Sequence, residues 1–220
     1  MWTFEPFANY PWQFALIAVV CYFFGAINFS VIFSRAVKKE DIRKNGSGNP
    51  GTTNMFRVYG LPLGALTFSC DALKGVLPCV LLNAVFSEVG YECGFAAYFA
   101  GLFVVLGHVF PVYYRFRGGK GFACTLGILF ALQPIFALCM TAVILLVVFI
   151  SDRMSIAAIV FVLCSIAWHW IFLFDQIGEA CLFFTLTCFV VLFAHRHNVA
   201  RLLKGKEMKT GVKSALRKKK

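Results

Sequence analysis

Three short polar stretches contain the residues of this chain that are best suited to chemistry. They are RKNGSGNPGTTN (43–54), GHVFPVYYRFRGGKGFACT (107–125) and HRHNVARLLKGKE (195–207). Each combines arginine or lysine with histidine, asparagine or glycine, within a sequence that is otherwise strongly apolar. Glycine-rich turns allow several backbone N–H groups to converge on an anion, because no Cβ atoms stand in the way. The three stretches therefore indicate the binding of phosphate-sized anions.

Two of these stretches run toward segments that we expect to be helical. GGKG (118–121) precedes the apolar FACTLGILF, and Lys120 adds a full positive charge. GSGNPGTTN (46–54) leads toward the next apolar segment in the same way. A helix N-terminus attracts anions through its dipole and its unpaired N–H groups. We therefore expect two phosphate groups to be bound near these turns.

The patterns that are missing narrow the chemistry. The sequence has no GxxxxGK[ST] spacing of a nucleotide-binding P-loop, no G-x-S-x-G nucleophile elbow and no H-x4-D pattern of acyl-CoA acyltransferases. The cysteines and histidines do not have metal-ligand spacing, so we expect neither a metal nor another cofactor. Carboxylates are scarce in the three stretches. This composition favours the positioning and charge neutralisation of phosphorylated substrates over attack by a protein nucleophile.

The composition of the whole chain predicts an integral membrane protein. Of its 220 residues, 60% are hydrophobic and only 14% are charged, whereas soluble domains are about 45–50% apolar and about 25% charged. A helix needs about 20 residues to cross the bilayer core, and helices satisfy their own backbone groups in lipid. We therefore predict an all-α polytopic helix bundle. Its apolar segments are 12–37, 62–87, 91–114, 122–150, 154–174 and 180–194.

The distribution of charge predicts the topology. Lysine and arginine are concentrated in 38–57, in 115–120 and from Arg196 onward, whereas the other connections carry acidic residues. Basic loops stay in the cytoplasm. The acidic N-terminal region is therefore placed outside and the basic tail inside, which requires an odd number of crossings. Pro134 offers a break that divides 122–150 into two short helices. We predict about seven transmembrane helices, with the N-terminus outside and the C-terminus in the cytoplasm; five crossings with one re-entrant segment is the alternative.

We expect one membrane-embedded domain, 1–220, with a basic cytoplasmic tail at 195–220. The net charge is +11, and the tail contains ten of the lysine and arginine residues. Such a tail contacts anionic membrane lipids, and we expect no nucleic-acid partner. The sequence leaves the oligomeric state open, and a monomer is compatible with it. A transporter of phosphorylated solutes is the alternative function, but few polar residues lie within the apolar segments to line a path.

The three motifs resemble those of the acyl-phosphate-dependent glycerol-3-phosphate acyltransferases (PlsY-type) of bacterial inner membranes. The family pattern SGNxGATN corresponds to 47–54, GHxxPxFxxFxGGKGxAT to 107–125, and HRxNIxRLxxGxE to 195–207. The resemblance covers almost the whole chain, with the motifs in the same order. It implies the transfer of a fatty acyl group from acyl phosphate to the sn-1 hydroxyl of glycerol 3-phosphate. The products would be 1-acylglycerol 3-phosphate (lysophosphatidate) and phosphate, formed on the cytoplasmic side of the inner membrane as the first step of phospholipid synthesis.

The resemblance also implies roles for individual residues. We expect Ser47, His108, Lys120 and Asn198 to be the catalytic residues. The expected substrate- and phosphate-binding residues are Arg43, Gly48, Asn49, Gly51, Thr53, Asn54, Gly118, Gly119, Gly121, His195, Arg201 and Glu207.

Some of these roles have alternatives. Ser47 is either a nucleophile or a hydrogen-bond donor, and we favour the donor. The acceptor of the hydroxyl proton is either His108, whose ordinary pKa is near neutral, or a phosphate oxygen of the substrate, which we favour. Glu207 is expected to pair with Arg201. Asp71 and Lys74 lie on one face of a helix and are expected to form an ion pair that orients the first polar stretch.

Overall fold

The computed structural model describes residues 5–88 and 94–211, and within these ranges every regular element is helical. The elements are α1 (Glu5–Asn9), α2 (Pro11–Ala26), α3 (Phe29–Lys38), the 3-10 turn η1 (Ile42–Lys44), α4 (Thr52–Tyr59), α5 (Leu61–Glu88), α6 (Phe95–Val109), the 3-10 turn η2 (Val112–Tyr114), α7 (Phe122–Leu132), α8 (Pro134–Ser151), α9 (Met154–Trp168), the π-helical turn η3 (His169–Leu173), α10 (Phe174–Ile177), α11 (Ala180–Ala194) and α12 (Arg196–Leu203). The prediction of an all-α bundle is confirmed for this part of the chain.

In the described part of the chain, five helical segments are long and apolar enough to cross a membrane: Pro11–Lys38, Leu61–Ser87, Phe95–Tyr114, Pro134–Ser151 and Met154–Ile177. The pair α11 and α12, bent by 53°, passes the same test together, and α7 is a shorter apolar helix. The predicted break at Pro134 is confirmed, since α7 ends at Leu132 and α8 begins at Pro134. Five spans, or six if the bent pair counts as one span, meet the length and hydropathy that a membrane crossing requires. The seven predicted crossings therefore stay a prediction.

The first apolar segment, expected to run unbroken over 12–37, is divided. Helix α2 ends at Ala26 and α3 begins at Phe29. The Asn28 side chain accepts a hydrogen bond from the backbone N–H of Val31 at 3.0 Å, which is the contact of an N-cap residue. Hydropathy cannot show this break, because the residues on both sides of it are apolar.

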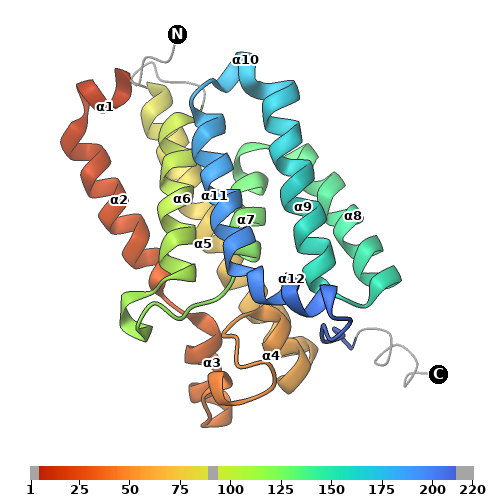
Figure 1. Ribbon diagram of the computed structural model, residues 1–220. Coiled ribbons are helices and arrows are strands. Elements are labelled where there is room, and N and C mark those ends of the chain that lie inside the picture. Colours follow the sequence, from red (N-terminus) through yellow and green to blue (C-terminus); the bar gives the residue numbers. More distant parts are fainter. Residues whose placement is uncertain (1–4, 89–93, 212–220) are drawn as a thin grey trace.

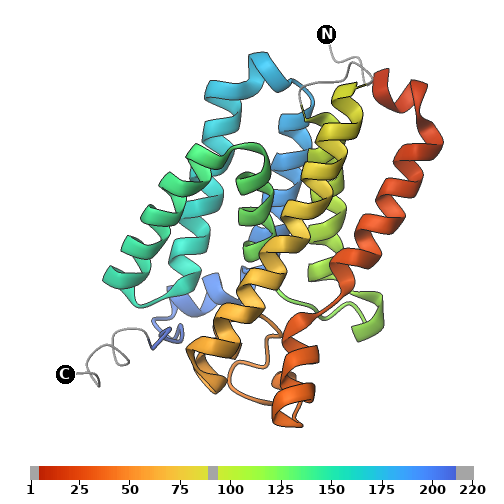
Figure 2. The same ribbon diagram turned by 180° about the vertical axis from the view of Figure 1, so that it is seen from behind.

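The polar stretches gather at one end of the bundle. Helices α3, α4 and α12 lie at that end together with the α6–α7 connection, while α1 and α10 lie at the other end (Figures 1 and 2). This arrangement agrees with the predicted segregation of charge. Which end faces the cytoplasm stays a prediction.

Helix α6 lies at the centre and packs against α2, α5 and α11. Glycines permit two of the close helix contacts. A Cβ atom on Gly25 would lie 2.1 Å from the carbonyl oxygen of Val104, and one on Gly75 would lie 2.1 Å from that of Cys124. Helices in membranes associate through such small residues, which let the backbones approach. These contacts fix α6 against α2 and α7 against α5.

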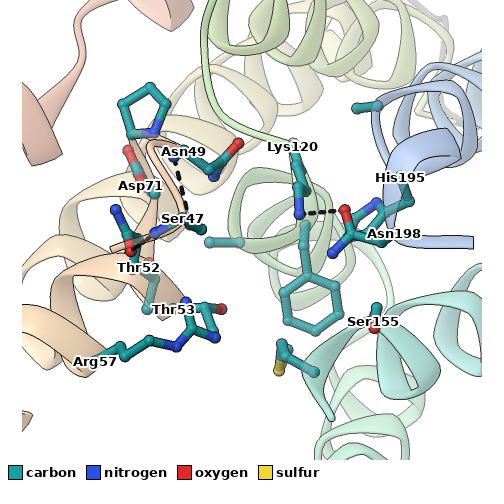
Figure 3. Close-up of a pocket in the computed structure, with 18 of the residues that line it drawn as sticks. Ser47, Asn49, Thr52, Thr53, Arg57, Asp71, Lys120, Ser155, His195 and Asn198 are labelled. Carbon is teal, nitrogen blue, oxygen red and sulfur yellow. Dashed lines mark hydrogen bonds between the residues drawn. The ribbon is translucent and has the colours of Figure 1, made fainter. Parts of the chain in front are cut away.

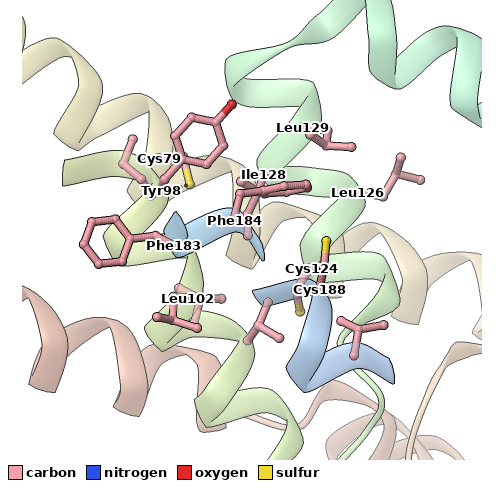
Figure 4. Close-up of a cluster of buried hydrophobic side chains, with 14 of the residues drawn as sticks. Cys79, Tyr98, Leu102, Cys124, Leu126, Ile128, Leu129, Phe183, Phe184 and Cys188 are labelled. Carbon is pink, nitrogen blue, oxygen red and sulfur yellow. Dashed lines mark hydrogen bonds between the residues drawn. The ribbon is translucent and has the colours of Figure 1, made fainter. Parts of the chain in front are cut away.

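The apolar core joins α5, α6, α7 and α11 (Figure 4). Tyr98, Ile128 and Phe184 are among its fully buried side chains. His169 is buried in the same region, where its ring stacks on Phe184 at 4.0 Å and its Nε2 lies 3.0 Å from the Tyr98 hydroxyl. His169 therefore has a packing role away from the three polar stretches.

Candidate functional site

All three polar stretches line one cavity of about 880 Å³ at the basic end of the bundle. Figure 3 shows Ser47, Asn49, Thr53 and Arg57 facing a second group that includes Lys120 and Asn198. Segments separated by more than 50 residues in the sequence thus form a single site, as the charge pattern predicted. The other lysine and arginine residues that line it are Arg43, Lys44, Arg117 and Arg201, and the lining histidines are His108, His195 and His197.

The first stretch is folded by its own polar side chains. Asp41 accepts hydrogen bonds from the backbone N–H of Arg43 at 3.0 Å and from the Arg43 side chain at 2.9 and 2.7 Å. The hydrogen bond from the Arg43 side chain holds the pKa of Asp41 well below its usual range, even though burial opposes ionisation. The Arg43 guanidinium also lies over the Tyr114 ring, 4.7 Å from the centroid. Arg43 is therefore tethered at the cavity edge by partners within the protein.

The Asn54 side chain fixes the backbone of this loop through hydrogen bonds. Its Oδ1 accepts a hydrogen bond from the N–H of Ser47 at 2.9 Å, and its Nδ2 donates to the Asn45 carbonyl at 2.9 Å. Asn54 is buried, and a Cβ atom on Gly46 would lie 2.3 Å from its Oδ1. Asn54 thus positions Ser47. It lines the cavity together with Ser47, Gly48, Asn49, Gly51 and Thr53.

The second stretch folds back on the end of α6. The N–H groups of Gly118 and Gly119 donate to the carbonyls of Val109 and His108, at 3.1 and 3.0 Å. These two amides therefore shape the turn, and they are already paired within the protein. A Cβ atom on Gly119 would lie 2.1 Å from His108 Nε2. The requirement for glycine at this position is the space that the imidazole occupies.

We expect Gly119→Ala to destabilise the protein by about 1–3 kcal/mol, because the new methyl group overpacks a buried site. Thermal unfolding in detergent measures the change. The matched control is the double variant Gly119→Ala/His108→Ala, in which the imidazole no longer opposes the methyl group. The two substitutions should be non-additive by at least about 1 kcal/mol. Additive effects would show that the ring is not what excludes a side chain.

A chain of hydrogen bonds links the second stretch to the third. Lys120 Nζ donates to Asn198 Oδ1 at 2.5 Å, and Asn198 Nδ2 donates to Glu207 Oε1 at 2.6 Å. Glu207 also accepts from Arg201 Nε at 2.8 Å, which confirms the expected pair. Burial opposes ionisation of Glu207, but the hydrogen bonds from its neighbours outweigh that effect and hold its pKa below the usual value. Glu207 and Asn198 therefore position the Lys120 ammonium.

The residues after α12 cross the rim of the cavity as a C-terminal strap, residues 205–211. The Lys209 carbonyl accepts from the Arg57 guanidinium at 3.3 and 3.2 Å. The Thr210 N–H donates to the Asp152 carbonyl at 2.7 Å, and the Thr210 hydroxyl donates to the Asp152 carboxylate. Ser155 donates to Glu207 at 2.9 Å. The strap is thus fastened to α4, to the α8–α9 turn and to α9. Residues 212–220 of the predicted tail lie outside the described residues.

One side of the cavity is apolar. Phe122, Leu126, Ile144, Val148 and Met154 line it, from α7, α8 and α9. Leu145 also lines the cavity and is 64% exposed on the outer surface of the bundle. The cavity therefore joins a cationic region to an apolar wall that reaches the membrane-facing surface.

The lining residues that sequence reasoning did not assign to the site include Arg57 and Ser155. The charge of Arg57 served only to predict the membrane topology, because this residue lies in α4, between the first stretch and the next apolar segment. Ser155 is a single hydroxyl near the start of an apolar helix, which is an ordinary occurrence in membrane proteins. Neither residue lies within a motif, so only the three-dimensional arrangement identifies it.

Comparison with known proteins agrees with the resemblance seen in the motifs. Residues 15–205 match the family model described as glycerol-3-phosphate acyltransferase. The chain belongs to the glycerol-3-phosphate acyltransferase family. The enzyme of that name from Clostridioides difficile (strain 630) is 39% identical over 202 residues, which are 91% of this chain and 97% of the relative. That from Finegoldia magna is 36% identical over 196 residues, 89% of this chain and 96% of the relative.

Solved structures of the acyltransferase family match the fold as well. One match is the crystal structure of PlsY, an integral membrane glycerol 3-phosphate acyltransferase, in its glycerol 3-phosphate form. It superposes with a TM-score of 0.82 at 30% sequence identity, and the match covers 93% of this chain and 98% of the PlsY chain. The lysophosphatidic acid form gives a TM-score of 0.77 at the same identity. The helical arrangement described above is therefore that of the family.

Proposed function

We propose that the protein transfers a fatty acyl group from acyl phosphate to the sn-1 hydroxyl of glycerol 3-phosphate, forming lysophosphatidate and inorganic phosphate. The observation that carries this proposal is the single cavity in which cations from three stretches meet an apolar wall. One region suits two phosphate groups, and the other suits a lipid chain. The names of the relatives support the acceptor, and PlsY was solved with glycerol 3-phosphate and with lysophosphatidic acid.

The cations of the cavity bind and orient the two phosphate groups. Lys120 is held at the junction of the second and third stretches by Asn198. Arg57 and Arg201 supply further positive charge. Ser47 supplies a hydroxyl on the same side as Arg57, facing Lys120 (Figure 3). Charge-assisted hydrogen bonds from lysine and arginine to a phosphate are about twice as strong as hydrogen bonds between neutral groups. Alignment of two reactants in one site removes much of the entropic part of the barrier.

The reaction needs no covalent enzyme intermediate. The sn-1 oxygen of glycerol 3-phosphate forms a bond to the acyl carbon, and the bond from that carbon to the bridging phosphate oxygen breaks. The hydroxyl proton passes to a phosphate oxygen, and inorganic phosphate leaves with the bridging oxygen. Lys120 neutralises the charge that develops on the leaving group. Ser47, whose N–H is fixed by Asn54, donates a hydrogen bond to a substrate oxygen rather than attacking the acyl carbon.

The apolar wall formed by α7, α8 and α9 receives the fatty acyl chain. Such a surface keeps the acyl chain out of water, where each exposed CH₂ group would cost about 0.8 kcal/mol. The exposed position of Leu145 provides the route by which the chain enters from the lipid. We assign the basic end of the bundle to the cytoplasmic side of the bacterial inner membrane, following the excess of lysine and arginine there.

Donor specificity tests the proposal. Purified protein is incubated with labelled glycerol 3-phosphate and one acyl donor in each reaction. The donors are acyl phosphate, acyl-CoA and acylated acyl carrier protein, all with the same acyl chain. Lysophosphatidate should form from acyl phosphate alone, and NMR of the product should place the ester on sn-1. Turnover with acyl-CoA but not with acyl phosphate would overturn the proposed donor. Uptake of labelled glycerol 3-phosphate into proteoliposomes without acylation would instead favour the transporter.

The pH dependence of acceptor binding is a separate prediction. Burial lowers the pKa of Lys120 from 10.5 to about 8; Glu207 partly restores it, and Arg201 and Arg57 lower it further. The ammonium is therefore present below pH 8 and lost as the pH rises above it. The dissociation constant of glycerol 3-phosphate should increase by up to about tenfold per pH unit above 8, because binding then requires uptake of one proton.

Calorimetric titrations at pH 7, 8, 9 and 10 measure this effect. Lys120→Arg is the matched control, because arginine keeps its charge throughout this range. Its affinity should be nearly constant from pH 7 to 10. Equal pH dependence in both proteins would show that Lys120 is not the titrating group.

A further inference from the structure

We infer that His108 is a hydrogen-bond donor to a phosphoryl oxygen of the substrate, and that Lys74 and Asp71 are positioning residues that fix its tautomer. This inference rests on the proposed function, since it concerns the same cavity. It differs from the role of proton acceptor that the sequence suggested as one alternative for His108. It also gives a function to the buried ion pair behind the site.

Lys74 is almost fully buried, and its ammonium has acceptors around it. Lys74 Nζ donates to the carbonyls of Gly25 and Ile27 at 3.1 and 2.7 Å. It also lies 3.0 Å from Asp71 Oδ1, which supplies the opposite charge. The two carbonyls and the Asp71 carboxylate can only accept hydrogen bonds, so Lys74 Nζ faces all three groups as a donor. Lys74 can then only donate hydrogen bonds.

The contact between Lys74 and His108 therefore determines where the imidazole proton lies. Lys74 Nζ is 3.1 Å from His108 Nδ1. Because the ammonium has no acceptor, Nδ1 must carry the lone pair. The nearest oxygen of Asp71 is 3.7 Å from Nδ1, too far for a hydrogen bond from a proton at that position. His108 is thus the neutral tautomer with its proton on Nε2.

This protonation state excludes His108 as a general base. Its one lone-pair nitrogen already accepts from Lys74, and its other nitrogen bears a hydrogen. Nε2 lies against Gly119, and His108 lines the cavity. The Gly118 and Gly119 amides are both directed to carbonyls of α6. The amides of this turn are therefore not available to a phosphate. We assign that contact to His108 Nε2–H, in addition to the ammonium of Lys120.

Two histidine substitutions distinguish a donor from a base. Glutamine places an N–H donor near the position of Nε2 and cannot act as a base, whereas phenylalanine keeps the size of the ring and has no donor. His108→Phe should raise the KM of at least one phosphate substrate by about 10–100-fold, the loss expected for one hydrogen bond to a charged group. His108→Gln should remain within about threefold of the wild type. Equal losses in both variants, or no loss in either, would overturn the inference.

The wild-type protein provides a second measurement that does not depend on the activity of these variants. ¹⁵N NMR of histidine-labelled protein in detergent micelles, with His108→Gln used only to assign its signal, reports the tautomer directly. The expected result is a protonated Nε2 and an unprotonated Nδ1 at neutral pH. A proton on Nδ1 would overturn the inference. Failure of the proposed function is recognised separately, as an absence of lysophosphatidate from the wild type.

Discussion

Replacement of Lys120 by alanine should lower kcat/KM for acyl transfer by about 10²–10³-fold, as expected when one charged donor to a developing anion is removed. Lys120 is the residue at which the second and third stretches meet, through its 2.5 Å hydrogen bond to Asn198. Its amine is partly desolvated, which strengthens its interaction with a phosphate in the same cavity. Initial rates of lysophosphatidate formation at pH 7 give the comparison.

Two further variants control this experiment. Lys204→Ala removes an exposed cation from the third stretch that does not line the cavity, and it should keep the wild-type rate. Lys120→Arg retains the charge and should lose less than Lys120→Ala. If Lys204→Ala were as inactive as Lys120→Ala, the effect would come from net charge and not from the position of Lys120.

Replacement of Lys74 by methionine should destabilise the protein by about 3–5 kcal/mol, the cost of leaving a buried carboxylate without its partner. Both side chains of the pair are at most 2% exposed, and their charged atoms are 3.0 Å apart. The ammonium also holds the carbonyls of Gly25 and Ile27, at the end of α2. Unfolding of the purified protein in mixed detergent micelles measures the change in free energy.

The double variant Lys74→Met/Asp71→Leu is the matched control. It removes both charges and leaves no buried ion, so it should be more stable than Lys74→Met alone. A double variant that is less stable than Lys74→Met would show that Asp71 has an independent structural role. A single variant within about 1 kcal/mol of the wild type would show that the pair is hydrated, contrary to its burial in the bundle.

The long elements of the fold could be predicted because membrane helices depend on length and hydropathy. The predicted segment 180–194 coincides with α11, and the break at Pro134 follows from the absence of a donor N–H in proline. The break at Asn28 could not be predicted in this way. It depends on the hydrogen bond that the Asn28 side chain accepts from the Val31 N–H in the next helix, and on the contacts of Lys74 with Gly25 and Ile27.

The site was predictable as a set of motifs and not as a geometry. The composition of the three stretches indicated that they share one function, and the cavity brings them together. The partners of each residue were not visible in the sequence. Asn54 and the amides of Gly118 and Gly119 were expected to bind phosphate, yet their hydrogen bonds are made within the protein. A motif residue that supports the backbone has the same sequence signal as one that contacts the substrate.

The strap illustrates the same limit. Glu207 was expected from the third motif, but Asp152, Ser155 and Thr210 fasten the strap through single contacts between distant segments. No periodicity or spacing encodes such contacts, since they arise only after the helices have packed.

A structure of this protein with glycerol 3-phosphate and a non-transferable acyl phosphonate tests the central claim most directly. Both phosphorus atoms should lie in the cavity between Ser47 and Asn198, with Lys120 in contact with at least one phosphoryl group and the acyl chain along α7 and α8. The sn-1 hydroxyl should lie within about 3.5 Å of the acyl carbon, as a near-attack geometry requires. Phosphoryl groups bound in separate cavities, or an acyl chain bound away from this wall, would contradict the account.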